Sequence, residues 1–170
     1  HRRGAGERHQ SRLDADGIHR EAVPVLPEEI ESRVVLAYTG VPRRSGINNW
    51  EVFKSHIDRD KRVFRNFENI ASIAREMHQA LVSMDWDEVA KLLREEWKLR
   101  RTNAPGITTP LIDKLIAVAG KHGGRAAKVC GAGGGGCVIF LVDKGSASRV
   151  ATAIGEAGGR VLPLQVARDG

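Results

Sequence analysis

The sequence predicts an α+β fold, a ferredoxin-like sheet of the split βαβ type with extra helices inserted into its first crossover. Two observations support this prediction. From residue 33 onward the apolar patterns run strand, helices, strand, strand, helix, strand, which is the split βαβ order. The 170 residues, 41% hydrophobic and 28% charged, suit one globular domain with appendages. We therefore expect an antiparallel or mixed sheet with helices mainly on one face.

The N-terminal part of the chain shows little sign of a domain. Residues 1–9 have no apolar periodicity, and we interpret residues 1–20 as a tail or a truncated remnant of a preceding domain. Asp16-Gly17 is a turn signal between two short runs and predicts a hairpin there. We assign one domain to residues 21–170.

The first strand and the first helices follow this region. Pro24 and Pro27 break the chain, and residues 33–39 then predict a strand that Gly40 ends. Ser45 or Asn48 could cap a short helix that continues to His56.

The clearest pattern in the chain is an apolar stripe that steps by four and three residues. Such a stripe predicts a long helix that packs in a bundle or against a sheet. Its members are Val63, Phe67, Ile70, Ala74, Met77 and Leu81.

Two further helices have clear starts. Asp85 with Glu88 three residues later resembles a capping box, and the helix that follows is expected to bury both Trp86 and Trp97. Thr109 as N-cap with Pro110 in the first turn predicts a third helix, which ends near residue 123.

The remaining elements surround a run of glycines. Residues 126–130 and the fully apolar residues 137–142 predict two strands, residues 146–156 an amphipathic helix, and residues 161–166 a last strand. Pro163 favours an edge position for that strand, because proline cannot donate to the ladder.

The run GAGGGG, residues 131–136, contains five glycines. It fits G-x-G-x-x-G in its letters, but a strand follows it, whereas a dinucleotide fingerprint opens a helix. No Lys-Ser or Lys-Thr follows, so it is not a Walker A loop. Two interpretations stay open: a loop whose bare backbone N–H groups line an anion site, which we favour, and a slack turn.

The segment KVCGAGGGGCVIFLV, residues 128–142, resembles the third signature motif of the GHMP kinases. Residues 106–128 resemble the helix that precedes that motif. The segments LAYTGVPRRSGINNWEVFK and FENIASIAREM are similar to the sugar-kinase branch that includes the heptose 7-phosphate kinases and galactokinase-like enzymes. The resemblance covers about residues 20–166.

The resemblance implies the C-terminal half of an ATP-dependent kinase that phosphorylates an alcohol group of a sugar or sugar phosphate. In that family the active site lies between two domains, and the N-terminal one carries a G-L-G-S-S loop for the ATP phosphates. This sequence has no such run. We therefore expect the catalytic residues, and much of the binding of ATP and Mg²⁺, in an N-terminal domain outside this chain. The chain alone would then lack catalysis.

Within this chain the expected site has two parts. The phosphate loop is formed by Gly131, Ala132, Gly133, Gly134, Gly135 and Gly136. The substrate candidates are Arg43, Arg44, Ser45, Thr108 and Lys128, of which the arginines suit a planar phosphate contact. A solvated basic loop explains Arg43 to Ser45 equally well, solvent exposure explains Lys128, and helix capping explains the neighbouring Thr109. No residues suggest a metal site in the chain itself.

Composition limits the other classes of partner. A net charge of +6 suits an anionic partner, yet basic and acidic residues alternate along helices, so we expect phosphorylated small molecules rather than nucleic acid. The longest apolar run, residues 137–142, is too short to span a membrane. Cys130 and Cys137, with no secretory signal, suggest reduced thiols and a cytoplasmic protein. A homodimer is left open. The alternative function is a non-catalytic ferredoxin-like module for ligand binding or regulation.

Overall fold

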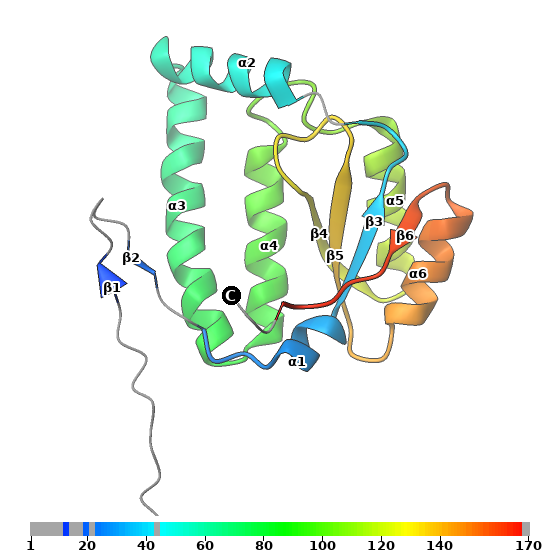
Figure 1. Cartoon of the computed structure of the whole chain (residues 1–170). Coiled ribbons are helices and arrows are strands. Elements are labelled where there is room, and N and C mark those ends of the chain that lie inside the picture. Colours follow the sequence, from blue (N-terminus) through cyan, green and yellow to red (C-terminus); the bar gives the residue numbers. More distant parts are fainter. Residues whose placement is uncertain (1–11, 14–18, 21–22, 43–44, 168–170) are drawn as a thin grey trace, which may run out of the picture.

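The computed structural model describes residues 12–13, 19–20, 23–42 and 45–167 (Figure 1). Two short strands, β1 (Arg12–Leu13) and β2 (His19–Arg20), pair antiparallel, as the predicted hairpin requires. The Asp16-Gly17 turn itself lies outside the described residues.

The main sheet has four strands in the order β4-β5-β3-β6. Each neighbouring pair is antiparallel, so the two strands of each βαβ unit are separated by a strand from the other unit. This is the split βαβ arrangement, and the predicted fold class is confirmed. The four strands are β3 (Val34–Tyr38), β4 (Gly124–Val129), β5 (Cys137–Val142) and β6 (Arg160–Leu162).

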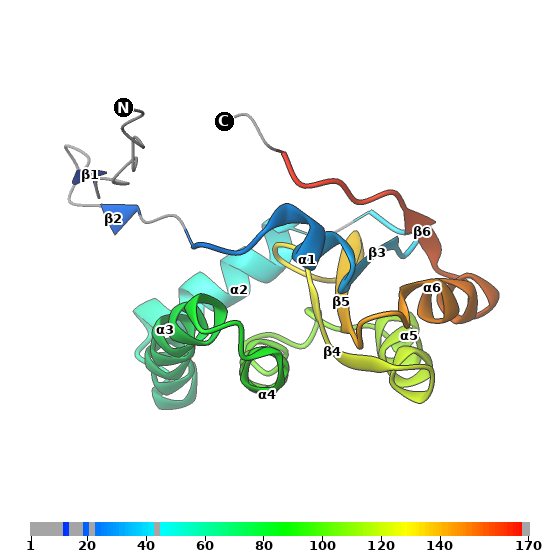
Figure 2. The same cartoon turned by 90° about the horizontal axis from the view of Figure 1, so that it is seen from below.

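The helices occupy two places around this sheet. α5 and α6 lie together on one face, while α3 packs on α4 and α4 packs along the edge strand β4 (Figure 2). The expectation of helices mainly on one face thus holds for α5 and α6, and the inserted helices form a second layer beside β4. The helices are α1 (Pro27–Glu31), α2 (Ser45–Ile57), α3 (Lys61–Val82), α4 (Trp86–Arg100), α5 (Pro110–Lys121) and α6 (Ala147–Glu156).

The core under α5 and α6 is apolar and closed. Phe140, Ile112, Leu115 and Ile154 are fully buried there between the sheet and the two helices. Each such side chain contributes about 1.5–3 kcal/mol when it leaves water. A second cluster joins α3 and α4 to Leu141 and other residues of the strands. Together the two clusters hold the glycine run at one end of a rigid sheet.

The buried face of α3 differs from the predicted stripe. Val63 of the stripe is fully buried, and Met77 and Leu81 are partly buried against the core, as predicted. Ile73, Ala80 and the polar Asn66 are buried as well, whereas Phe67 and Ala74 of the stripe are exposed. The buried Asn66 makes polar contacts at this face, with Leu99, Thr102 and Asn103. The Phe67 ring therefore lies at the surface of the protein and not in the core.

The helix starts follow the sequence closely. The Asp85 side chain accepts from Glu88 N at 3.0 Å, and Thr109 Oγ1 accepts from Ile112 N at 3.2 Å, as predicted. The cap of α3, Asp60, was not predicted, and neither was the short helix α1, which Pro27 begins. Of the tryptophans, Trp97 is buried, and Trp86 is partly buried beneath the Arg33 guanidinium. β6 ends at Leu162, directly before Pro163, so the last strand is shorter than residues 161–166.

Within the described ranges, no helix combines the length and apolarity needed to cross a membrane.

Candidate functional site

The glycine run connects β4 to β5 at the end of the sheet opposite α1 (Figure 1). Its five glycines all have a positive φ, a region that side chains disfavour. The values are +83° at Gly131, +77° at Gly133, +75° at Gly134, +144° at Gly135 and +75° at Gly136. The glycines are therefore required by the backbone path, which is not that of a slack turn.

The second part of the run, Gly133 to Gly136, is buried between two other loops. Gly134 N donates to Ile107 O at 2.9 Å, and Gly136 N donates to Val41 O at 2.7 Å. A Cβ on Gly133 would overlap the Ile107 carbonyl, and a Cβ on Gly135 would lie 2.6 Å from Val41 O. These glycines permit close backbone packing, and two of their amides are already occupied.

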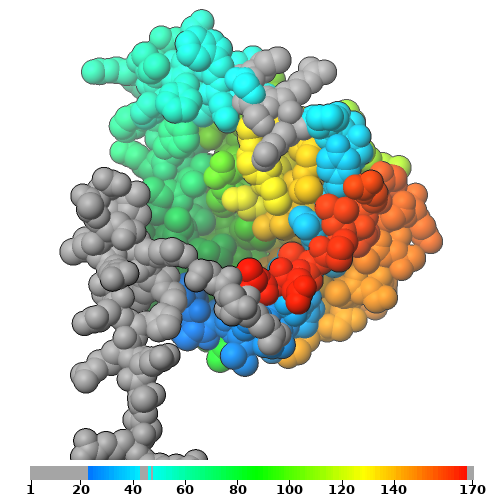
Figure 3. Space-filling model, viewed as in Figure 1, coloured from blue at the N-terminus to red at the C-terminus, as the bar shows by residue number. Residues whose placement is uncertain are grey.

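The first part of the run is different, because Gly131 is exposed and Ala132 is half-buried. Both border a cavity of about 590 Å³. In Figure 3 the surface of the glycine run (yellow) lies below α2 (cyan) and beside α3. The other residues that line the cavity are Asn48, Asn49, Val52, Phe53, His56, Phe67, Arg100, Asn103 and Ile107.

Asn48 ties α2 to this part of the run. Its side chain is buried, and Nδ2 donates to Ala132 O and to Gly106 O, both at 3.0 Å. A Cβ on Gly106 would lie 2.5 Å from Asn48 Oδ1, so glycine makes room for the amide. One buried side chain thus fixes three segments that the sequence separates widely.

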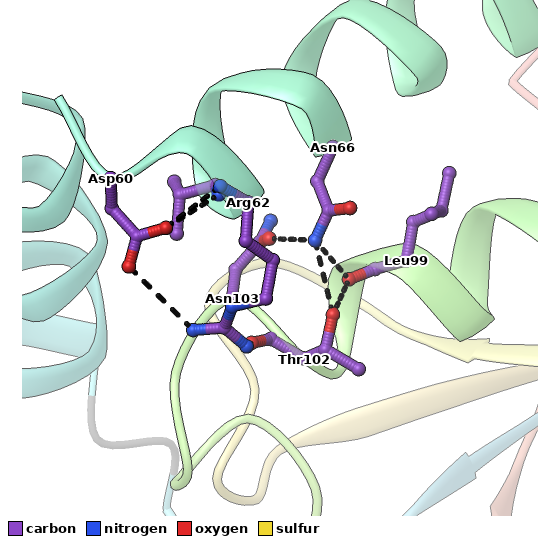
Figure 4. A network of polar contacts seen from close by, with 7 residues as sticks. Asp60, Arg62, Asn66, Leu99, Thr102 and Asn103 are labelled. Carbon is purple, nitrogen blue, oxygen red and sulfur yellow. Dashed lines mark hydrogen bonds and ion pairs between the residues drawn. The ribbon is translucent and has the colours of Figure 1, made fainter.

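The loop after α4 is held by a second amide network (Figure 4). Asn66 Nδ2, on α3, donates to Asn103 Oδ1 at 2.8 Å and to Thr102 Oγ1 at 3.0 Å. Arg62, which also faces Asp60, donates to Thr102 O. Because Asn103 lines the cavity, this network sets one of its walls.

Aromatic rings form the outer wall of the cavity. The His56 ring stacks on the Phe64 ring, with 5.5 Å between the ring centroids, and it contacts the Phe67 ring edge-on, with 5.3 Å between the centroids. Phe53 is 63% exposed and Phe67 38%. Exposed rings on adjacent helices are unusual for a surface without a partner or ligand.

One carboxylate and two cations lie on the α4 and β4 side. Glu96 Oε1 accepts from Lys128 Nζ at 2.9 Å and also from Arg100, and the Glu96 side chain is only 8% exposed. Glu96 neutralises one of the two cations. A charge of about one unit therefore remains near Arg100, which lines the cavity.

The predicted substrate residues lie in different surroundings. The Lys128 side chain pairs with Glu96, and Thr108 Oγ1 donates to Asp113 Oδ1 at 2.9 Å. Ser45 begins α2, while Arg43 and Arg44 lie outside the described residues. Neither Lys128 nor Thr108 is among the described residues that line the cavity.

The sequence interpretation missed Asn49, His56, Arg100 and Asn103, and it considered Asn48 only as a helix cap. A detectable signal was the INN triplet within an otherwise amphipathic helix, because adjacent asparagines are poor helix formers and need another reason. Arg100 and Asn103 gave no such signal.

Cys130 and Cys137 flank the run and are joined by a backbone bond from Cys130 N to Cys137 O at 2.8 Å, with no disulfide. In the part of the chain that the structure describes, no group of three or more His, Cys, Asp or Glu side chains could hold a metal ion. No carboxylate lines the cavity among the described residues.

The family comparison agrees with the fold and the loop. Residues 77–160 match the family model described as GHMP kinases C terminal. The chain therefore carries a GHMP kinase C-terminal domain, and the suspected resemblance is confirmed.

The curated relatives are kinases. The chain is 28% identical over 120 residues to the bifunctional fucokinase/GDP-fucose pyrophosphorylase of Arabidopsis thaliana, covering 71% of the chain and 11% of that protein. It is 23% identical over 145 residues to the D-glycero-alpha-D-manno-heptose 7-phosphate kinase of Campylobacter jejuni, covering 85% of the chain and 42% of that enzyme. A mevalonate kinase of Thermococcus sibiricus is 38% identical over 68 residues, covering 40% of the chain and 20% of that enzyme. The chain spans less than half the length of each of these relatives.

Solved structures share the fold. The Lin0012 protein from Listeria innocua superposes with a TM-score of 0.73 at 24% identity, covering 79% of this chain and 39% of that chain. Galactokinase from Lactococcus lactis, solved with galactose, gives a TM-score of 0.64 at 20% identity, covering 80% and 45%. The α+β architecture is thus that of GHMP kinase C-terminal domains.

Proposed function

We propose that this chain is the C-terminal half of an ATP-dependent kinase that phosphorylates an alcohol group of a sugar or sugar phosphate. The observation that supports this most is the glycine run, which lies within the GHMP kinase C-terminal match and has its exposed end on a cavity. The fucokinase and the heptose 7-phosphate kinase match 71% and 85% of this chain, whereas the mevalonate kinase of Thermococcus sibiricus matches 40%, and this broader match supports a sugar acceptor.

We propose that only part of the glycine run binds a ligand, and that the backbone amides do not all take part. Gly134 N and Gly136 N already donate to carbonyls, so Gly131 and Ala132 are the residues that would meet a substrate or phosphate. Phosphoryl transfer depends on positioning and on charge stabilisation, which a fixed backbone edge can supply without reorganisation.

The proposed partner is the N-terminal kinase domain of the parent protein. On α2, Trp50, Phe53 and Ile57 form an exposed apolar stripe, and Phe53 also borders the cavity. A domain packed on this stripe would close the cavity, and it would supply most of the site for ATP and Mg²⁺. Mg²⁺ bound to nucleotide phosphates needs carboxylate ligands, and the cavity lining offers none among the described residues. A kinase that uses ATP is expected in the cytoplasm.

The test uses the parent protein with its N-terminal domain. Incubation with ATP–Mg²⁺ and a panel of sugars and sugar phosphates should release ADP with at least one acceptor, and a thermal-shift scan should show stabilisation by the same compound. The 170-residue chain alone should release none. A parent that neither releases ADP nor is stabilised by any nucleotide would overturn the proposal.

The alternative is a ligand-binding or regulatory module without catalysis. It is favoured by the sequence, which contains no G-L-G-S-S run for the ATP phosphates. Calorimetry on the parent that shows binding of a sugar phosphate, with no ATP turnover, would support this alternative.

A further inference from the structure

We infer that the cavity between α2, α3 and Gly131–Ala132 binds a sugar phosphate, with its phosphate at Arg100 and its ring beside Phe53 and Phe67. This inference rests on the proposed function for its choice of a sugar. It goes further because it assigns the acceptor to a particular cavity and requires an anionic group on it.

The apolar side of the cavity suits a ring with exposed C–H groups. Phe53 and Phe67, on two different helices, present exposed rings there, and Val52 and Ile107 add apolar surface. A cavity of about 590 Å³ with apolar walls and a few placed polar groups has the size and character of a small-molecule site.

The polar groups are of the kinds that hydroxyl groups require. Asn48 Nδ2 is used by two carbonyls, which leaves Oδ1 as an acceptor, and Asn103 Oδ1 is used by Asn66, which leaves Nδ2 as a donor. Asn49 is exposed and offers both. A hydroxyl both donates and accepts, so a polyol can satisfy this mixed set.

The charge distribution favours an anion over a neutral sugar. Glu96 is shared by Arg100 and Lys128, so one positive charge is left uncompensated beside a lining without carboxylates among the described residues. Glu96 accepts from Arg100 Nε and pairs with Nη2, and Arg100 is itself one of the residues that line the cavity. Guanidinium groups bind phosphate through planar, charge-assisted hydrogen bonds.

The test is a titration of the ¹⁵N-labelled 170-residue chain, followed by NMR, with three probes: mannose 6-phosphate, mannose and inorganic phosphate. We expect mannose 6-phosphate to shift the backbone amides of Gly131 and Ala132 and the side-chain amides of Asn49 and Asn103. Its dissociation constant should be about tenfold lower than that of either other probe, as a charge-assisted hydrogen bond implies.

Arg100→Gln should remove this advantage and leave the weak binding of mannose unchanged. Lys128 still pairs with Glu96 in that variant, so no buried carboxylate is left alone. Lys98→Gln is the matched control: it removes one positive charge from an exposed residue of the same helix that does not line the cavity. Asn49→Ala, on an exposed side chain, gives a second variant that should weaken binding of both sugars.

The inference is overturned if none of the probes shifts these amides, if inorganic phosphate binds as tightly as mannose 6-phosphate, or if Arg100→Gln behaves like Lys98→Gln. These outcomes are distinct from failure of the proposed function. A parent that phosphorylates a neutral sugar while the cavity amides stay unmoved would refute the cavity assignment alone. A parent without ADP release, whose cavity still binds mannose 6-phosphate, would refute the kinase alone.

Discussion

The two parts of the glycine run share a composition but have different surroundings. Gly133 to Gly136 are buried, and their backbone is hydrogen-bonded to the loops at Ile107 and Val41. Gly131 and Ala132 border a cavity, and their main fixed contact is the Asn48 amide on Ala132 O. The comparison teaches that a glycine-rich loop can be a packing device at one end and a ligand surface at the other.

The largest effect is expected from Gly133→Ala. Both Gly133 and Gly145 have a positive φ, +77° and +85°, but only at Gly133 would a Cβ meet another backbone segment. Gly145→Ala should lower the free energy of unfolding by about 1 kcal/mol through backbone strain alone. Gly133→Ala should lower it by about 3 kcal/mol or more, because the Ile107 loop must also move. Equal losses in urea unfolding would contradict the packing role.

Asn48→Ala should have the next largest effect. It leaves two carbonyls without a buried donor, and we expect a loss of about 1–3 kcal/mol in the free energy of unfolding. Hydrogen exchange should quicken at the amides around Ala132 and Gly106. Asn49→Ala, on the exposed neighbour, should change stability by less than about 0.5 kcal/mol. If the two variants unfold alike, α2 is not anchored through Asn48.

Gly131→Ala should cost less than Gly133→Ala. Gly131 has a φ of +83° and is exposed, so we expect a loss of about 1 kcal/mol from backbone strain. In the ligand titration, however, this variant should weaken binding of mannose 6-phosphate. A loss of stability as large as that of Gly133→Ala would mean that the two parts of the run are not distinct.

The smallest effect on stability is expected at the end of the sheet opposite the glycine run, where a substitution should leave the run unchanged. Hydrogen bonds from Lys144 and then Arg33 lower the pKa of Glu29, on α1, below its usual value of 4.5. Because the pKa is lower in the folded state, the resulting stabilisation is present above about pH 4.5 and is lost as the pH falls through the folded value. Glu29→Gln should remove this acid dependence without changing the exchange of the glycine-run amides. An unchanged acid dependence in the variant would exclude Glu29 as its source.

The sequence predicted the strand order and the starts of α4 and α5 well, because these depend on local features. The apolar run 137–142 is β5 as predicted, and Asp85 and Thr109 cap their helices through their own side chains. The phase of α3 was less well predicted. Its buried face includes Asn66, which an apolar pattern cannot reveal, because a polar residue is buried only where a partner such as Asn103 is supplied by another segment.

The same reason explains which parts of the site could be predicted. The glycine run was identifiable because five residues with positive φ leave glycine as the natural choice at each. Lys128 and Thr108 were reasonable candidates by position, but Glu96 and Asp113 are placed beside them only in the folded chain. Arg100 ends α4 and Asn103 lies in the loop that follows. Both border the cavity, and the same loop contacts α2 through the bond from Asn48 Nδ2 to Gly106 O, which no local pattern indicates.

Local features of the sequence set the order of strands and helices, the caps of α4 and α5 and the need for glycine at the β4–β5 connection. These depend on backbone sterics and on hydrogen bonds between residues close in the chain. The tertiary structure decided which glycine amides are occupied, which face of α3 is buried and which side chains surround the cavity. Those outcomes depend on contacts between segments far apart in the chain, such as Asn48 with Gly106 and Ala132, which are 58 and 84 residues away, and only packing brings such segments together.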